Sequence, residues 1–266
     1  MRELEAVQIS ILLPVRNEGI NLRIMLKILR AILEMPHEVL VVCDHLDDTS
    51  IPIVTSMQQE YSNLRLIHNQ LGAGVTNAIR AGVESARGHY VLIFAADEVG
   101  PVLAIEDMLA LMEEGCDFVS CTRYAHGGRR LGGSTIGQIL SRTANRLFHA
   151  ISGCVLTDAT TGIKLIRRSV FNQIQLEAGP VGWAVAFEIS MKAQLAGFKL
   201  GEVPIISIDR LYGGESSFRV GPWVVEYLRW FVWGSMRLRK SSKMQRTPVS
   251  VRATSGVPLA AQVKRL

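Results

Sequence analysis

Short apolar runs alternate with helical stretches over roughly the first 125 residues of the chain. Between residues 18 and 34 the apolar side chains recur every three or four positions, which is the period of one helix face. The runs between the helical stretches are short and rich in Val, Ile and Leu, which is typical of buried strands. The pattern predicts strands at 8–15, 38–44, 64–69, 90–97 and 116–123, and helices at 18–34, 48–61, 74–86 and 101–113.

This alternation predicts an α/β fold whose mostly parallel central sheet is covered by helices on both faces. Residues 38–44 and 90–97 are almost continuously apolar, as expected of strands that are buried on both faces. Beyond residue 124 the alternation is less regular. There the pattern predicts a glycine- and arginine-rich loop at 125–134, helices at 134–151 and 183–196, a strand at 163–168, and a strand pair or bent strand at 198–210.

The chain therefore divides into three expected parts. Residues 1–221 would form one folded domain, and residues 222–240 a separate amphipathic helix. Residues 241–266 are rich in Ser, Lys, Arg, Pro and Ala without periodicity, so we expect a disordered basic tail.

Composition narrows the class of protein. The 266 residues are 48% hydrophobic, enough for a large core, and the formal net charge of +5 permits an anionic partner without indicating nucleic acid. The four cysteines form no CxxC pair and have no histidine cluster beside them, so we expect reduced thiols in the cytosol. The first ten residues lack the apolar stretch of a signal peptide, and no run of 18 uncharged apolar residues predicts a membrane-spanning helix.

Charged residues gather directly after the predicted strands. In an open parallel sheet, ligands bind beyond the carboxyl ends of the strands, so these residues would share one rim. Carboxylates there suit Mg²⁺ or Mn²⁺, and arginines suit a phosphorylated ligand. The alternative is that the carboxylates only cap the helices that follow, above all Asp48. The residues concerned are Arg16, Glu18, Asp44, Asp47, Asp48, Asp97, Glu98 and Arg123.

Two common nucleotide-binding motifs do not occur where they would be needed. A dinucleotide site requires GxGxxG directly after the first strand, where this chain has "PVRNEG". The two glycines of "GAGVTN" follow the third strand instead, and a Walker lysine motif does not occur. Binding through a glycine fingerprint is therefore disfavoured.

Six segments together carry a resemblance to a known family. They are "ISILLPVRNEG", "VLVVCDHLDD", "GAGVTNAIRAGVESARGHYVLIFAADEVGP", "SCTRYAHGG", "DATTGIKLIRR" and "GEVPIISIDRLYGGESSF". In order and spacing they resemble family 2 glycosyltransferases with the GT-A fold, and most closely the dolichol- or polyprenyl-phosphate mannosyltransferase branch. The resemblance spans residues 8–220, and it implies an inverting glycosyltransferase.

For the sugar donor, the resemblance implies a site for a nucleotide diphosphate sugar. Its residues would be Pro14, Arg16, Glu18, Asp44, Gly74, Ala96 and Asp97. Arg16 stands where the branch usually has tyrosine, and Cys43 replaces the first of two aspartates after the second strand. The family's Asp-x-Asp metal motif reads Ala95, Ala96, Asp97 here, so Asp97 keeps one ligand and Glu98 is the candidate substitute. The implied cofactor is Mg²⁺ or Mn²⁺.

For the acceptor, the resemblance implies a lipid phosphate held by Arg123, Ser141, Arg142 and Arg210. Asp158, Thr160, Thr161 and Gly162 match the Asp-Pro-Thr-Ser-Gly turn of the branch, with Ala159 for proline. Glu188 matches a glutamate of the branch that either faces the site or anchors its helix. A phosphate oxygen is already anionic near pH 7, so it attacks the anomeric carbon without a strong base. Asp97, Arg123 and Arg210 are the expected catalytic residues.

The helix expected at 222–240 has two interpretations. Three tryptophans and one tyrosine lie near Arg237, Arg239 and Lys240, which is typical of a helix in the plane of a membrane interface. The alternative is a helix that packs in the core or in a dimer. The first interpretation predicts a peripheral protein at the cytoplasmic face of the plasma membrane or of an equivalent membrane.

Two other functions remain open at this point, and a third is disfavoured. The acceptor would be a hydroxyl group if Asp158 or Glu188 were placed as a base. The losses at Cys43, Ala95 and Val99 would also fit a non-catalytic protein that binds nucleotide sugars. A nucleotidyltransferase of similar topology is disfavoured, because the chain lacks its glycine-rich first loop with a lysine.

Overall fold

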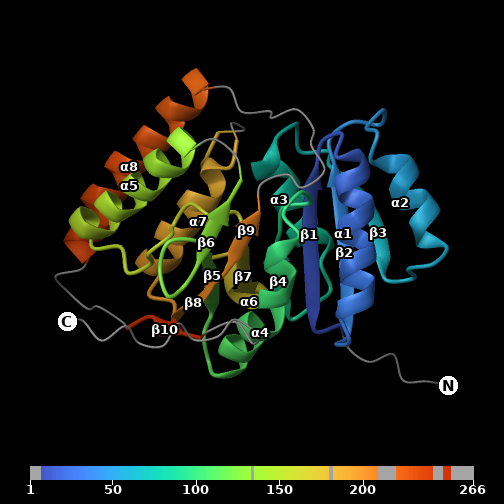
Figure 1. The fold of residues 1–266 in the computed structure, drawn as a ribbon, viewed down its shortest axis with the longest axis horizontal. Helices are drawn as coiled ribbons and strands as arrows, with labels where there is room; N and C mark the ends of the chain where they lie inside the picture. Colours follow the sequence, from blue (N-terminus) through green and yellow to red (C-terminus); the bar gives the residue numbers. More distant parts are fainter. Residues whose placement is uncertain (1–6, 133–134, 180–181, 209–219, 242–247, 253–266) are drawn as a thin grey trace.

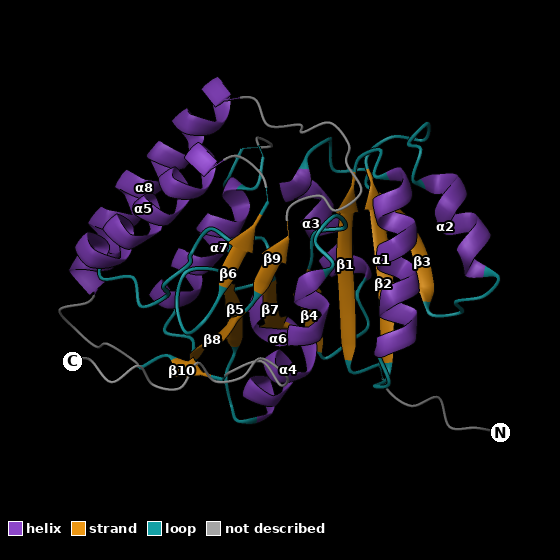
Figure 2. Ribbon diagram, viewed as in Figure 1, coloured by secondary structure: helices purple, strands orange, loops and turns teal. Residues whose placement is uncertain are grey.

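The computed structural model describes residues 7–132, 135–179, 182–208, 220–241 and 248–252. Within them, eight strands form one sheet in the order β10-β8-β5-β7-β4-β1-β2-β3. Helices lie on both sides of this sheet, as Figures 1 and 2 show. The strands are β1 (Ile9–Val15), β2 (His37–Cys43), β3 (Leu64–His68), β4 (Tyr90–Ile93), β5 (Phe118–Thr122), β6 (Arg129–Leu131), β7 (Lys164–Arg167), β8 (Leu200–Pro204), β9 (Ile206–Ile208) and β10 (Ser250–Val251).

The helices follow the expected alternation closely. Pro101 lies in the first turn of a short 3₁₀ helix, η1, that leads directly into α4, so the helix expected at 101–113 has two parts. The helices are α1 (Gly19–Ile32), α2 (Ile51–Gln58), α3 (Val75–Ser85), η1 (Gly100–Ala104), α4 (Ile105–Glu113), α5 (Thr135–Ser152), α6 (Arg168–Phe171), α7 (Ala184–Leu195) and α8 (Val220–Ser241).

The main sheet is parallel except at β7. Strands β4, β1, β2 and β3 pair in parallel, and so do β5, β8 and β10. β7 lies between β4 and β5 and is antiparallel to both of them. The mostly parallel α/β sheet that the sequence predicts is therefore confirmed, with one reversed strand that brings the turn before β7 to the carboxyl end of β5.

Two apolar cores lie on opposite faces of the sheet. Along β1, Ile11 and Leu13 join the core beneath α1, α2 and α4, while Leu12 joins the core on the α3 and α7 side. Val41 and Val42 of β2 divide in the same way. Successive strand residues point to opposite faces, so a strand covered on both faces must be apolar throughout.

Three local features differ from the sequence prediction. β4 ends at Ile93 rather than at residue 97, and residues 95–98 form a turn closed by the Glu98 amide and the Ala95 carbonyl at 3.4 Å. The glycine- and arginine-rich loop contains β6, which pairs with β9 in a separate two-stranded sheet. The segment 198–210 divides into β8 and β9 with Ile205 between them.

The predicted disordered tail is wrong for residues 248–252. β10 adds a parallel edge strand to β8, and the Arg252 amide continues the ladder to the Glu202 carbonyl at 3.2 Å. The Arg252 side chain donates to Asp107 Oδ1 at 3.1 Å and to Glu114 Oε1 at 2.7 Å. Edge pairing uses backbone groups, which have no sequence periodicity, so the pattern gave no sign of this strand.

Helix α8 packs on α7 and α5 at one end of the sheet (Figure 1). Trp230 and Leu238 are buried in the core on that side. A Cβ at Gly234 would lie 2.0 Å from Met191 Sδ, so the glycine allows α8 to approach α7 closely. Among the described residues, no helix is both long and apolar enough to cross a membrane.

Candidate active site

At the carboxyl edge of the sheet, Asp48 joins the loops that follow β1 and β2. Both carboxylate oxygens of Asp48 accept the Asn17 amide, at 3.1 Å each, and Oδ1 also accepts the Ser50 amide at 2.8 Å. Ser50 Oγ in turn accepts the Glu18 amide at 3.1 Å. Asp48 is buried and fixes the loops after β1 and β2 together, whereas the N-cap residue of α2 is Ser50, which has no side-chain cap bond.

Asp44 and Gly74, both predicted in the donor site, are bonded to each other. Asp44 Oδ2 accepts the Gly74 amide at 2.7 Å, and Oδ1 accepts Asn69 Nδ2 at 2.7 Å. Gly74 has a φ of 119° at the start of α3, a conformation that favours glycine. These bonds fix the start of α3 at the rim. Contact of Asp44 or Gly74 with a nucleotide stays a prediction.

The other predicted donor residues lie along the same edge. Pro14 is near the carboxyl end of β1, Arg16 is exposed just beyond it, and Glu18 is half-buried before α1. Ala96 is buried in the turn after β4, with Asp97 and Glu98 half-buried beside it. The sheet topology therefore brings the predicted donor residues to one rim, because β1, β2 and β4 run in parallel.

Asp97 and Glu98 are the carboxylates predicted to hold the implied metal. Among the described residues, no group of three or more His, Cys, Asp and Glu side chains is placed to hold an ion. Mg²⁺ in phosphate-transfer sites often has only one or two protein carboxylates, with substrate phosphates and water as the other ligands. The donor set at this turn fits such an ion, and Asp97 and Glu98 as its ligands stay a prediction.

Arg123 is held at the carboxyl end of β5 by the turn before β7. Its Nε donates to Asp158 Oδ2 at 2.7 Å, and its Nη2 donates to Asp158 Oδ1 at 3.0 Å and to Thr160 Oγ1 at 3.1 Å. The Arg123 side chain is 11% exposed and that of Asp158 is 0% exposed. Such a bidentate pair fixes both position and orientation of the guanidinium.

The electrostatics of this pair keep both groups charged. Burial disfavours the ionised carboxylate of Asp158, but the adjacent Arg123 charge and its hydrogen bonds hold the Asp158 pKa below its ordinary value. Burial likewise opposes the Arg123 charge, and the Asp158 carboxylate outweighs that effect and raises the Arg123 pKa. Glu98 contributes to raising the same pKa, so the β4 turn and Arg123 share one electrostatic environment.

Ser141 is connected to the Arg123–Asp158 pair through Tyr124, a residue that the sequence analysis did not single out. The Tyr124 hydroxyl donates to Ser141 Oγ at 2.8 Å, and the Arg123 guanidinium lies 5.1 Å from the centre of the Tyr124 ring. Arg142, the next residue on α5, is exposed. Arg210 lies outside the described residues, so its predicted role stays a prediction.

A buried polar network supports the Asp158 turn from behind. Asn145 of α5 accepts the Ala159 amide at 3.1 Å and donates to Thr160 Oγ1 at 2.8 Å. Glu202 of β8 accepts the amides of Thr157 at 2.8 Å and Asp158 at 3.3 Å. Burial raises the Glu202 pKa to about 7, although these bonds oppose the shift. The network fixes the turn that holds Arg123.

Lys164 and Glu202 were both missed by the sequence analysis. Lys164 Nζ is fully buried and donates to Ser120 Oγ at 2.7 Å, and burial lowers the Lys164 pKa to about 8. Their signal in the sequence was a charge inside an otherwise apolar strand, as in "IKLI" and "GEVPI". Charged residues are rarely buried without a partner, so such positions are informative.

The two carboxylates considered as bases have other roles. Glu188 is buried and accepts the Glu177 amide at 2.5 Å, the Ala178 amide at 2.8 Å and Lys192 Nζ at 2.8 Å. It therefore anchors α7, as one of its two interpretations held. Asp158 is bonded to Arg123, and a lowered pKa makes it a weak proton acceptor.

Comparison with known proteins identifies the family. The sequence model of the family described as "Glycosyl transferase family 2" matches residues 10–175, more than half of the chain. The chain belongs to glycosyltransferase family 2. It is a glycosyltransferase with a GT-A-like fold, which confirms the family, fold and enzyme class that the motifs implied.

Two curated relatives cover most of this family 2 chain. Polyprenol monophosphomannose synthase of Mycolicibacterium smegmatis is 26% identical over 227 residues, or 80% of this chain and 85% of the relative. Dolichol-phosphate mannosyltransferase of Mycosarcoma maydis is 25% identical over 231 residues, or 84% of this chain and 77% of the relative.

Solved structures of low identity show the same fold. Glucosyl-3-phosphoglycerate synthase from Mycobacterium tuberculosis, in complex with phosphoglyceric acid, has a TM-score of 0.67 at 16% identity and covers 93% of this chain and 91% of its own. The same enzyme in complex with Mn²⁺, UDP and glucosyl-3-phosphoglycerate has a TM-score of 0.66 at 15% identity, covering 88% and 83%.

Proposed function

We propose that this glycosyltransferase moves a sugar from a nucleotide diphosphate sugar to a polyprenyl- or dolichyl-type lipid phosphate, with inversion, at the cytoplasmic face of a membrane. The observation that carries the proposal is the geometry of Arg123. Asp158 and Thr160 hold its Nε and Nη2, and the Ser141 hydroxyl lies beside it through Tyr124. A fixed guanidinium with a hydroxyl nearby suits a phosphate monoester.

The bonds made by Asp158 and Glu188 support a phosphate acceptor rather than a hydroxyl acceptor. A hydroxyl acceptor needs a base at the reacting oxygen, and both candidates among the described residues, Asp158 and Glu188, are bonded elsewhere. A lipid phosphate oxygen is already anionic near pH 7. The chain then has to align acceptor and donor and to hold the acceptor phosphate, which Arg123, Ser141 and Arg210 would do.

On the donor side, the rim from Pro14 to Asp97 would hold the nucleotide sugar. Asp97 and Glu98 would hold Mg²⁺ or Mn²⁺, which when bound neutralises charge on the leaving diphosphate. The neighbouring enzyme from Mycobacterium tuberculosis was crystallised with Mn²⁺ and UDP, which supports a divalent cation here. The names of the two curated relatives make mannose the first sugar to test.

The direct test is transfer by the full chain. The protein would be incubated with Mn²⁺, a polyprenyl phosphate and each of a panel of radiolabelled nucleotide diphosphate sugars, beginning with mannose. The matched control acceptor is the polyprenol of the same length, which has a hydroxyl in place of the phosphate. We expect a labelled lipid from the phosphate alone.

Three outcomes would contradict the proposal in different ways. Labelling of the polyprenol would show a hydroxyl acceptor. A non-catalytic binding protein would show no transfer, and its nucleotide-sugar affinity by calorimetry would be the same with and without Mg²⁺ or Mn²⁺. No transfer from any donor in the panel would refute the proposed reaction altogether.

A further inference from the structure

Helices α5 and α8 lie side by side at one end of the molecule (Figure 1), and each turns an apolar stripe to solvent. Along α5 the exposed apolar residues lie one or two turns apart, and along α8 they lie one turn apart. Leu147 of α5 is 51% exposed and Leu228 of α8 is 59% exposed. The α5–α8 face consists of Ile139, Leu140, Leu147 and Ile151 with Val225, Leu228, Val232 and Met236.

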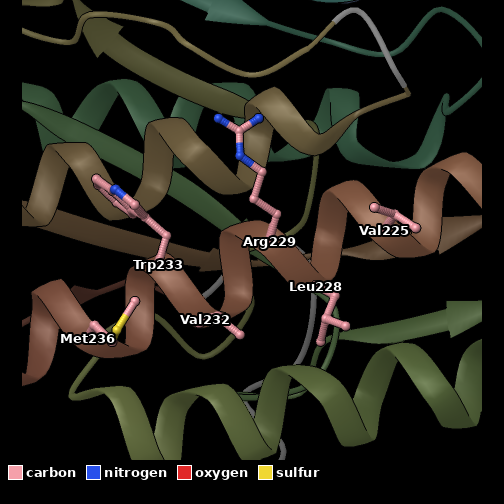
Figure 3. A pocket seen from close by; sticks show the side chains of 6 residues that line it. All are labelled: Val225, Leu228, Arg229, Val232, Trp233 and Met236. Atoms are coloured by element: carbon pink, nitrogen blue, oxygen red, sulfur yellow. The ribbon is translucent and has the colours of Figure 1, made fainter.

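This exposure is a property of the outer faces alone. The inner faces of the same helices are used for packing, since Phe148 of α5 and Trp230 of α8 are buried in the core. A shallow groove of about 500 Å³ lies on the outer side of α8 (Figure 3). Among its lining residues, Leu228 and Val232 point to one side of the helix and Arg229 to the other. Exposed apolar patches of this kind mark interaction surfaces.

The charge on this face has one sign. Residues 135–152 contain no aspartate or glutamate, and α8 contains a single acidic residue, Glu226. Glu226 is 13% exposed, accepts Trp230 Nε1 at 2.9 Å and the Gly179 amide at 3.1 Å, and pairs with Arg229 at 3.5 Å. Other exposed cations on the two helices are Arg142, Arg146, Arg237, Arg239 and Lys240.

Charge complementarity selects the occupant. In a two-fold dimer the same surface faces itself, so these arginines would approach arginines. An anionic bilayer complements them and accepts the leucine and valine side chains, while the long cationic side chains reach the headgroups. We propose that the α5–α8 face docks on an anionic lipid surface, with both helices in the plane of the interface.

The proposed docking face adjoins the acceptor site. Ser141 lies on the inner side of α5, bonded to Tyr124, and Tyr227 of α8 lies within the electrostatic reach of Arg123 and Asp158. A phosphate at headgroup depth would thus meet Arg123 between the two helices. This last step rests on the proposed lipid-phosphate acceptor, whereas docking itself does not. It also extends the single interfacial helix that the sequence predicts, because α5 supplies half of the surface.

The test is co-sedimentation of the full chain with vesicles of phosphatidylcholine, with and without about 30% phosphatidylglycerol, at low and high salt. We expect the wild type to bind the anionic vesicles at least about tenfold better than the neutral ones, with salt weakening the binding. Leu147→Ser with Leu228→Ser, and separately Arg146→Glu with Arg237→Glu, should each lower anionic binding about tenfold or more. Leu103→Ser, at an exposed leucine of η1 outside this face, should not change it.

The readouts separate this proposal from the proposed reaction. Transfer to a short-chain, water-soluble prenyl phosphate without vesicles should be equal in the wild type and both double variants. Equal activity with lost vesicle binding supports docking, and vesicle binding by a chain that transfers no sugar refutes only the reaction. Equal binding of the wild type to neutral and anionic vesicles would overturn the docking surface, and so would variants that bind like the wild type. A dimer interface would also overturn it. In that case light scattering would show a dimer that Leu147→Ser with Leu228→Ser dissociates, while vesicle affinity would be unchanged.

Discussion

Arg123 and Asp158 are joined by two parallel hydrogen bonds, Nε to Oδ2 at 2.7 Å and Nη2 to Oδ1 at 3.0 Å. Arg123 directly follows β5, and Asp158 lies in the turn before β7. The two residues meet because β7 is antiparallel to β5. The pair is almost completely shielded from water. It therefore serves both the stability of this end of the sheet and the orientation of the proposed phosphate ligand.

Asp158→Ala should destabilise the fold strongly. Loss of one partner leaves the Arg123 charge buried without its counter-charge, which costs about 3–5 kcal/mol in comparable pairs. Urea unfolding at neutral pH measures the change. The double variant Arg123→Met, Asp158→Leu should recover most of that loss, since it removes both charges, yet it should transfer no sugar. A loss below about 1 kcal/mol in the single variant would show that the pair contributes little.

Arg123→Lys should impair the acceptor step selectively. Lysine cannot donate the two parallel bonds to Asp158, so its ammonium would not be fixed toward the phosphate. We expect kcat/KM for the lipid phosphate to fall about 100-fold or more, with nucleotide affinity by calorimetry unchanged. Tyr124→Phe removes only the hydroxyl that donates to Ser141 and should cost about tenfold or less. Equal losses in donor and acceptor affinity would argue against this assignment.

Asp97→Ala should abolish transfer and also the metal dependence of nucleotide binding, while Glu98→Ala should cost less. The family resemblance implies that Asp97 is the one carboxylate of the Asp-x-Asp metal motif that this chain retains. Glu98 is its neighbour in the turn after β4. Calorimetric titration of a nucleoside diphosphate with and without Mn²⁺, and again after chelation with EDTA, measures the effect. Full activity of the Asp97 variant would overturn the placement of the donor site.

Glu202→Gln should stabilise the protein in alkaline solution but not in acid. The folded-state pKa of about 7 lies above the ordinary value of 4.5, so the charged carboxylate is disfavoured in the fold. The contribution of Glu202 to stability therefore falls as the pH rises from about 4.5 to about 7 and stays low above that. Gln keeps an acceptor for the Thr157 and Asp158 amides, and its amide can donate to the Thr157 hydroxyl, which lies 2.8 Å from Thr122 Oγ1.

The measurement is the free energy of unfolding in urea at two pH values. We expect the Gln variant to gain on the order of 2 kcal/mol at about pH 8 and close to nothing at about pH 4.5. Ionisable groups around Glu202 include Asp158, Lys164, His126, Cys121 and Cys154, and they are the same in both proteins. An equal change at both pH values would show that Glu202 does not titrate in this range.

Local periodicity was enough to predict most of the elements. The stripe through Leu22, Leu26 and Leu29 predicts α1, and the apolar run at 38–44 predicts β2. The ordered motifs predicted the family and the GT-A-like fold, both confirmed by comparison. These features follow from the sequence because a helix or a buried strand imposes its own repeat on neighbouring residues.

The hydrogen-bond partners of individual polar groups were decided by contacts between distant residues. Asp44, Asp48 and Glu188 have similar signals in the sequence, yet the structure commits them to Gly74, Asn17 and the amides before α7. The burial of Lys164 and Glu202 and the edge strand β10 likewise depend on partners far along the chain.

The sequence by itself determined the repeat of α5 and α8, and hence that each is amphipathic. The tertiary structure alone decided that α8 packs on α5 and α7, while an apolar stripe on the outer side of α5 and of α8 stays exposed. The physical reason is that periodicity specifies a helix's apolar stripe through local geometry, whereas burial depends on which surfaces the whole fold brings together.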